Sequence, residues 1–245
     1  MPTVTVLHTN DMHGRLSERR ARALLELKQE NPEAIVLDAG DALAAGNLWP
    51  NPLGEPTLEQ MGRVGYDAMC VGNREFHLFS RVVKWKLGNC RHKVLSANLR
   101  VQRGENPGVE KVWRKTLANG ARVCAFGLTL PMVTERMRIG KLASLLLDDP
   151  LEVGEAMARE LRAECDLLIA LTHLGLERDR ELLKRAPEID LVVGGHSHTP
   201  LEEPLQVGRG YIVQAGPWAR SAGVVKVSLG AGGALRAEGR LVSLA

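Results

Sequence analysis

The sequence predicts an α/β fold in which a mainly parallel β-sheet is covered by helices. Two observations predict it. Short apolar segments rich in β-branched residues alternate along the chain with longer segments whose apolar residues recur at helical spacing. Several apolar segments also end abruptly at polar residues, as buried strands do at the edge of a sheet.

The first half of the chain shows this alternation most clearly. A strand over residues 4–7 precedes a helix over 18–30, and Pro32 ends that helix because it cannot continue the hydrogen-bonding pattern. The next expected elements are a strand over 34–37, a helix over 57–64, and strands over 68–71 and 93–97.

The second half begins with a polar turn region over 101–108 and a hairpin. Asn119-Gly120 favours a tight turn between strands over 113–117 and 122–128. We then expect helices over 150–164 and 179–186, strands over 167–171 and 189–193, and antiparallel strands over 211–214, 222–229 and 235–242.

Length and composition indicate one soluble globular domain. The chain has 245 residues, of which 44% are hydrophobic and 25% charged, and it contains no internal repeat or low-complexity tract. Aromatic residues make up only 4%, which argues against a single-stranded nucleic-acid binder. A net charge of +3 identifies no partner, although it would not repel a phosphate ester.

The N-terminus and the cysteines bear on location. The chain shows neither a signal peptide nor an apolar run long enough to span a membrane, so we expect a cytoplasmic protein with no membrane partner. The four scattered cysteines form no metal-binding pair, and we interpret them as small core residues of a protein in a reducing compartment.

Polar residues able to bind a metal follow one apolar strand after another. In open α/β sheets, ligands bind where the carboxyl ends of the strands emerge, so residues far apart in sequence can meet there. The residues at these ends are Asp11, His13, Asp41, Asn73, His173, His196 and His198.

Each of these residues also has an ordinary structural explanation when taken alone. Asp11 and His13 could lie in a solvated loop, Asp41 could cap a helix, Asn73 could be a turn residue, and His173 could be a core histidine. His196 and His198 are a stronger signal, because alternate residues of an extended segment point the same way. Structural explanations would have to hold at every strand end at once, so we favour a metal site.

Seven ligands are more than one ion needs, and two ions sharing a bridging carboxylate would use them all. Mixed oxygen and nitrogen ligands suit Mn, Fe, Zn or Co. Two ions about 4 Å apart stabilise both the attacking and the leaving oxygen in an in-line displacement at phosphorus. The pattern therefore predicts a hydrolase whose partner is a small-molecule phosphate ester.

Two segments also carry a family resemblance. VTVLHTNDMHGRL (4–16) resembles the first signature of the 5'-nucleotidase family, and YDAMCVGNREFH (66–77) resembles the second. Gly40-Asp41 lies between these two segments, and His173 and GGHSHT (194–199) come after them, which is the family's order. The chain is similar to the N-terminal calcineurin-like metallophosphatase domain of that family.

This resemblance implies a four-layer α/β/β/α sandwich with two metal ions and a metal-bridging hydroxide as the nucleophile. We expect the ions to be manganese, with zinc, iron, nickel or cobalt as the alternatives. The first implied ligand set is Asp11, His13, Asp41 and His198. The second is Asp41, Asn73, His173 and His196, so that Asp41 would bridge the two ions.

The second signature departs from the family pattern at the pair that assists the leaving group. Where the family has His and then Asp in GNHEFD, this chain has Arg74 and His77. Arginine can neutralise charge but cannot act as a general acid, whereas His77 could donate a proton from a shifted position. The candidate catalytic residues are therefore Asn73, Arg74 and His77.

Length is the second departure. The chain ends where the family's C-terminal nucleoside-binding domain would begin, so we expect a single metallophosphoesterase domain over 1–245 with broad specificity. The alternative is a metal- and phosphate-binding regulatory module with weak or lost turnover, and Arg74 is the feature that separates the two interpretations.

Overall fold

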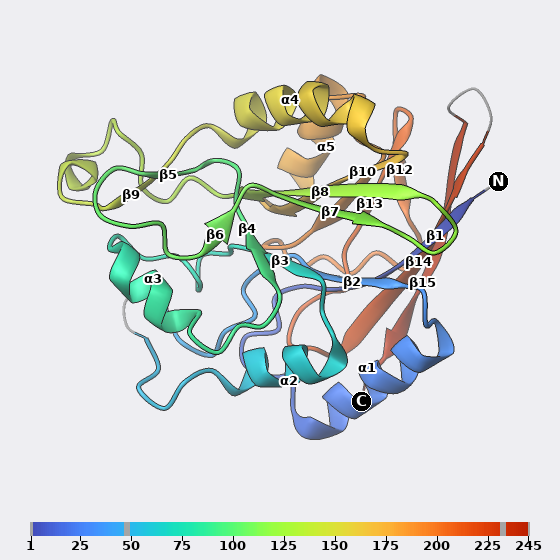
Figure 1. Cartoon of the computed structure of the whole chain (residues 1–245), viewed down its shortest axis with the longest axis horizontal. Helices are drawn as coiled ribbons and strands as arrows, with labels where there is room; N and C mark the ends of the chain where they lie inside the picture. The colour runs from blue at the N-terminus through green and yellow to red at the C-terminus, as the bar shows by residue number, and fades with distance from the viewer. Residues whose placement is uncertain (1, 47–49, 231–233, 245) are drawn as a thin grey trace.

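The computed structural model describes residues 2–46, 50–230 and 234–244. Two β-sheets lie face to face, with α4 (Pro150–Leu161) and α5 (Leu176–Arg185) outside one sheet and α1 (Glu18–Glu30) and α2 (Pro56–Val64) outside the other (Figure 1). This arrangement confirms the α/β/β/α sandwich that the sequence resemblance implied.

The first sheet has the strand order β15-β14-β1-β2-β3-β4-β6. Its strands are β1 (Thr3–Thr9), β2 (Ile35–Asp38), β3 (Ala68–Cys70), β4 (Lys93–Leu95), β6 (Val109–Glu110), β14 (Ser221–Leu229) and β15 (Leu235–Ser243). From β1 to β6 the strands are parallel, whereas β14 and β15 add antiparallel pairs at the other edge.

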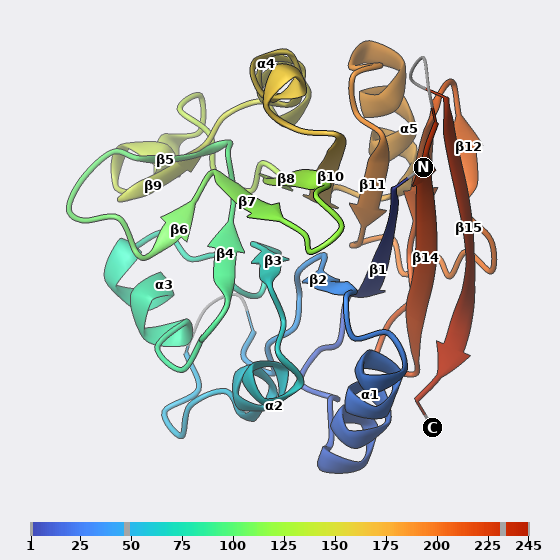
Figure 2. The ribbon, with the colours of Figure 1, turned by 45° about the vertical axis from the view of Figure 1, so that its right-hand side comes forward.

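The second sheet has the order β12-β13-β11-β10-β8-β7. Its strands are β7 (Val112–Thr116), β8 (Arg122–Thr129), β10 (Leu167–His173), β11 (Leu191–Gly194), β12 (Leu205–Val207) and β13 (Gly210–Val213). Its centre is parallel and its two outer pairs are antiparallel, and β7–β8 is the predicted hairpin. The parallel strands that the sequence predicted are thus divided between two stacked sheets, which Figure 2 shows from a second angle.

Alternating side chains on each strand hold the layers together. Leu7 on β1 packs in the apolar cluster that includes residues of α1 and α2, whereas its neighbour Val6 packs between the two sheets. On the second sheet, Ile169 faces the layer between the sheets and Leu168 packs with residues of α4 and α5. Both central strands are therefore covered on both faces, which leaves their carboxyl ends as the places where polar side chains emerge.

Several elements differ from the sequence predictions. Helix α3 (Ser80–Lys86) and the small antiparallel pair β5 (Leu99–Val101) and β9 (Leu145–Leu147) were not predicted. Helix α5 begins at Leu176 rather than at the predicted Asp179. Gly175 directly precedes it with a φ of 90°, a conformation that glycine adopts readily, and the chain turns there into the helix.

The four cysteines are free thiols, and three are buried, as the sequence predicted for core residues. Among the described residues, none of the helices has the length and apolar character that crossing a membrane requires.

Candidate metal centre

Backbone strain is concentrated at the predicted metal ligands. Their φ angles are positive at Asp11 (51°), His13 (50°), Asp41 (56°), His196 (75°) and His198 (55°). Residues with a β-carbon rarely adopt this left-handed region, and such strain persists only where the surrounding structure enforces it, typically at functional sites. The loops that carry the ligands are therefore held in a special geometry.

Backbone hydrogen bonds between the first two loops enforce this geometry. The N–H of Asp11 donates to Gly40 O at 2.9 Å, and the N–H of His13 donates to Asp41 O at 2.9 Å. Gly72 in the third loop approaches so closely that a β-carbon there would lie 2.5 Å from Asp41 Oδ1. Only glycine leaves room for that carboxylate, so the loops after β1, β2 and β3 form one packed unit.

One group of ligand atoms joins the first loop to the loop after β11. Asp11, His13 and His198 each offer an atom within 4.8 Å of the others. His13 Nε2 lies 3.0 Å from His198 Nε2, and Asp11 Oδ1 lies 3.4 Å from the same nitrogen. Two imidazole nitrogens and a carboxylate oxygen thus converge on one point.

A second group lies beside it and shares Asp11. Asp11, Asp41 and His173 also offer atoms within 4.8 Å of one another. His173 Nε2 lies 3.5 Å from Asp41 Oδ1 and 3.1 Å from Asn73 Oδ1. The ring of His196 lies 5.1 Å from that of His173, centroid to centroid, so all seven predicted ligands gather in one place.

The hydrogen bonds around His173 fix which of its nitrogens is available. Its Nδ1 lies 2.8 Å from Ala39 O, and a carbonyl oxygen can only accept, so Nδ1 carries the proton. In the neutral ring Nε2 then carries a lone pair, and the two oxygens that it faces, Asn73 Oδ1 and Asp41 Oδ1, are acceptors as well, so a cation between them is a partner that all three atoms could share. A histidine that binds a metal through one nitrogen and donates from the other to a carbonyl is a common arrangement in metal sites.

Unused bonding capacity tests whether these residues fit a metal ion. Among the described residues, Asp11 Oδ1 and His13 Nδ1 are buried yet have no hydrogen-bond partner, which is rare for buried polar atoms. Burial is also the main factor that lowers the pKa of His13 and of His196, which favours the neutral form of both rings. Neutral imidazoles and a carboxylate are the forms that bind divalent ions, and the residues fit such a group.

Glu75 connects two of the loops that carry the ligands, and the sequence patterns did not identify it as a site residue. The side chain is fully buried, and its carboxylate accepts hydrogen bonds from the N–H groups of Asp41 (2.9 Å), Gly72 (2.8 Å) and Leu43 (3.2 Å). It therefore ties the loop of Asp41 to the loop of Asn73. The signal in the sequence was an acidic residue two positions after a predicted ligand.

The two residues that replace the family's catalytic pair lie in different surroundings. Arg74 is partly exposed, its Nε lies 3.9 Å from Asp41 Oδ2, and its Nη1 donates to Ala44 O at 3.1 Å. His77 accepts a hydrogen bond at Nδ1 from Phe79 N (3.1 Å) and packs against the Phe79 ring, at the start of α3. Arg74 thus faces the ligands, and the contacts of His77 described here tie it to the helix.

A cavity of about 550 Å³ opens over the ligands. Its lining residues are His13, Gly14, Arg15, Ala44, Arg74, His198 and Trp218. Two arginines give this cavity positive charge, which suits a phosphate group. Trp218 is an aromatic residue that the sequence analysis missed, because its place in the cavity depends on the loop between β13 and β14.

The sequence also matches the model of a protein family, described as calcineurin-like phosphoesterase, over residues 4–200. The chain belongs to the calcineurin-like phosphoesterase family. The matched segment includes all seven predicted ligands, from Asp11 to His198.

Individual relatives point in the same direction. Over 238 residues the phosphoesterase domain is 30% identical to the trifunctional nucleotide phosphoesterase protein YfkN of Bacillus subtilis, covering 82% of this chain and 16% of that protein. It is 29% identical to a 5'-nucleotidase of Diplobatis ommata, covering 80% of this chain and 37% of the relative. The chain thus spans less than half the length of these curated relatives.

Solved structures share the fold. A 5'-nucleotidase precursor from Thermus thermophilus superposes with a TM-score of 0.82 at 26% identity, covering 99% of this chain and 54% of that one. The calcineurin-like phosphoesterase YfkN from Bacillus subtilis superposes with a TM-score of 0.74 at 20% identity, over 99% of this chain and 91% of that chain.

Proposed function

We propose that this domain hydrolyses phosphate esters, nucleotides among them, with broad specificity and with two divalent transition-metal ions. The observation that carries the proposal is the convergence of the ligand atoms in two groups that share Asp11, beneath a cavity lined by Arg15 and Arg74. Relatives described as nucleotide phosphoesterase and 5'-nucleotidase support the choice of substrate class.

Asp41 is the proposed bridge between the two ions. Its Oδ1 lies 3.5 Å from His173 Nε2, and its Oδ2 lies 3.9 Å from His13 Nδ1, so each carboxylate oxygen faces a different group of ligands. The proposed sets are Asp11, His13, Asp41 and His198 for one ion, and Asp41, Asn73, His173 and His196 for the other. When bound, such ions supply Lewis acidity, and manganese is our first choice among them.

Arg74 is proposed to neutralise charge on the substrate. Its guanidinium stays protonated and lines the cavity beside Asp41, so it favours negative charge at the phosphate and at the departing oxygen without transferring a proton. His77 is the remaining candidate for a proton donor. Without a general acid, esters of acidic phenols should react much faster than esters of ordinary alcohols.

A screen of esters with defined metals tests the proposal. Protein stripped of metal is reconstituted with Mn²⁺, Mg²⁺, Zn²⁺, Ni²⁺ or Co²⁺ and assayed with AMP, UMP, p-nitrophenyl phosphate, an alkyl phosphate and bis(p-nitrophenyl) phosphate. We expect hydrolysis of several esters with at least one transition metal. Two bound ions without turnover of any ester would favour the regulatory module instead, and no bound metal would refute both.

A further inference from the structure

The loop between β13 and β14 is attached to the first ligand loop and holds Trp218 in a strained conformation. Trp218 has a φ of 65° and Ala219 a φ of 51°, values that are unusual for residues with bulky or ordinary side chains. Trp218 N donates to Asp11 O at 2.7 Å, and Arg20 Nη1 donates to Trp218 O at 3.0 Å. The backbone of Trp218 is therefore fixed directly to a predicted metal ligand.

The indole ring forms part of the cavity wall. It meets the ring of His198 edge to face at a centroid distance of 5.9 Å, and 40% of the residue remains exposed. The guanidinium of Arg220 lies 4.5 Å from the indole centroid, a cation–π contact that holds the ring in place. A large apolar ring is thus kept rigid and accessible beside the site where the phosphate would bind.

Only some parts of a phosphate ester can use such a surface. The phosphate would be drawn to the ligand cluster and to Arg15 and Arg74, whereas the cavity wall formed by Trp218 offers no charge of its own. A planar aromatic group attached to the phosphate could stack on the indole, and a small alkyl group would gain little there.

We propose that Trp218 is a specificity-determining residue that contacts the leaving group and favours phosphate esters of planar aromatic groups. This inference rests on the proposed function, because it assumes that the phosphate lies at the ligand cluster. It assigns leaving-group recognition to the metal-binding domain itself.

A purely structural role for Trp218 makes a different prediction. If the indole only held His198 in position, its removal would disturb the metal site and would weaken the binding of aromatic and alkyl substrates equally. Selectivity between aromatic and alkyl ligands therefore separates the two roles, and metal content gives an independent check on the integrity of the site.

Binding and turnover are measured on wild type, Trp218→Ala, Trp218→Phe and Trp85→Ala, each reconstituted with Mn²⁺. Trp85 on α3 is the matched control, since it is 58% exposed and lies outside the cavity lining. Titration calorimetry with phenylphosphonate and methylphosphonate gives affinities without hydrolysis. Phenyl phosphate and methyl phosphate give kcat/KM, and elemental analysis gives the bound metal.

We expect Trp218→Ala to weaken phenylphosphonate binding and kcat/KM for phenyl phosphate about tenfold, with less than about a twofold effect on the methyl ligands. Trp218→Phe should retain most of the preference, and Trp85→Ala should match wild type. Equal losses for phenyl and methyl ligands, or no loss in Trp218→Ala, would overturn the inference. If wild type hydrolyses neither ester, the proposed function fails, and the phosphonate affinities still decide the role of Trp218.

Discussion

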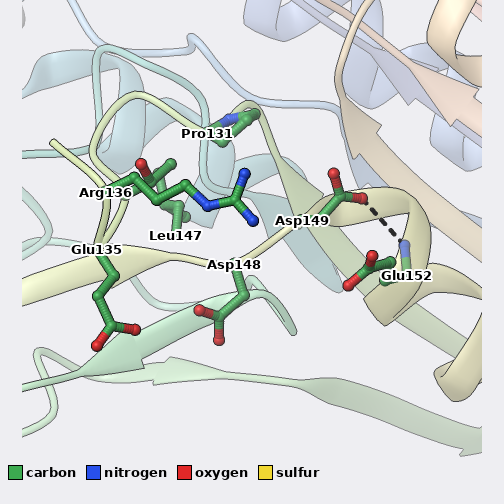
Figure 3. A pocket seen from close by; sticks show the side chains of 8 residues that line it. Pro131, Glu135, Arg136, Leu147, Asp148, Asp149 and Glu152 are labelled. Atoms are coloured by element: carbon green, nitrogen blue, oxygen red, sulfur yellow. Dashed lines mark hydrogen bonds between the residues drawn. The ribbon is translucent and has the colours of Figure 1, made fainter.

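Two cavities of nearly equal volume differ in how their charged residues are satisfied. One, of about 550 Å³, lies over the predicted metal ligands, and the other, of about 540 Å³, lies beside the start of α4 (Figure 3). The lining of the second consists of Pro131, Thr134, Glu135, Arg136, Leu147, Asp148, Asp149 and Glu152. Volume alone would rank the two as equal candidates for a binding site.

Charged groups in the second cavity either have partners or are exposed at the surface. Arg100 Nη2 lies 3.3 Å from Asp148 Oδ1 and 3.2 Å from Glu135 Oε2, and these side chains are largely exposed. Asp149 accepts the N–H groups of Leu151 and Glu152 as the N-cap of α4. The acidic residues of this cavity therefore cap a helix or form ion pairs at the surface.

The cavity over the ligands has the opposite character. Asp11 is fully buried, and among the described residues its Oδ1 accepts no hydrogen bond. Five predicted ligands, Asp11 among them, have positive φ angles, whereas all described lining residues of the second cavity have negative ones. The comparison teaches that unused bonding capacity and backbone strain identify a site where volume does not.

The largest expected effect comes from replacing the proposed bridging carboxylate. Asp41→Asn removes a charge that faces both groups of ligands, and the loss of supporting residues alone typically costs 10- to 100-fold. We therefore expect hydrolysis to fall more than about 100-fold and metal content to drop, while circular dichroism stays unchanged. Asp148→Asn in the second cavity is the matched control and should keep wild-type activity. Comparable losses in both variants would break the distinction between the two cavities.

The second-largest expected effect is on stability, and it comes from Asp179, a buried acid next to the loop that carries His196. Asp179 is fully buried, with its carboxylate 2.7 Å from Thr172 Oγ1, and burial raises its pKa to about 7. The folded state thus holds a proton that the unfolded chain releases near pH 4. Stability contributed by this proton is present at low pH and is lost as pH rises from about 4 to 7.

Asp179→Asn should remove this pH dependence, because its amide is neutral throughout. Urea unfolding at pH 4, 6 and 8 should show wild type losing stability relative to the variant by roughly 4 kcal/mol between pH 4 and 8. Parallel pH profiles for the two proteins would contradict a protonated Asp179 in the folded state.

The smallest effect is expected at the second cavity. Arg100→Ala breaks exposed ion pairs with Asp148 and Glu135, and such pairs typically contribute about 0–1 kcal/mol. Thermal unfolding should therefore change little, and kcat/KM should match wild type for every ester. A clear loss of activity would show that the second cavity takes part in the function.

Sequence reasoning located the candidate ligands because their position depends on local information. A polar residue that follows a buried parallel strand must emerge at the carboxyl edge of its sheet, and this rule placed Asp11, Asp41 and His173 together. Their distribution between two ions was implied by resemblance, and it stays a prediction. In the structure Asp11 belongs to both groups of close ligand atoms, and the two oxygens of Asp41 face both.

The features that were missed depend on contacts between distant segments. The β5–β9 pair joins residues 99–101 to 145–147, and no local pattern encodes that register. Helix α3 begins at Ser80, and its N-cap residue Phe79 forms no side-chain cap, so the usual start signal is missing. Trp218 reaches the cavity only because its loop bonds to Asp11, which the sequence does not reveal.

The position of β1 between β2 and β14 determines when, during synthesis, the predicted ligands can come together. The ribosome makes Asp11 and His13 long before their partners, because His13 meets His198, 185 positions further along the chain, and Asn10 Oδ1 accepts a hydrogen bond from Ala215 N. Closing so long a loop is slow, and it requires every segment up to β14 to have been made. Four of the seven predicted ligands are therefore synthesised well before His196 and His198, and we expect the ions to be acquired only after β14 and β15 have docked beside β1.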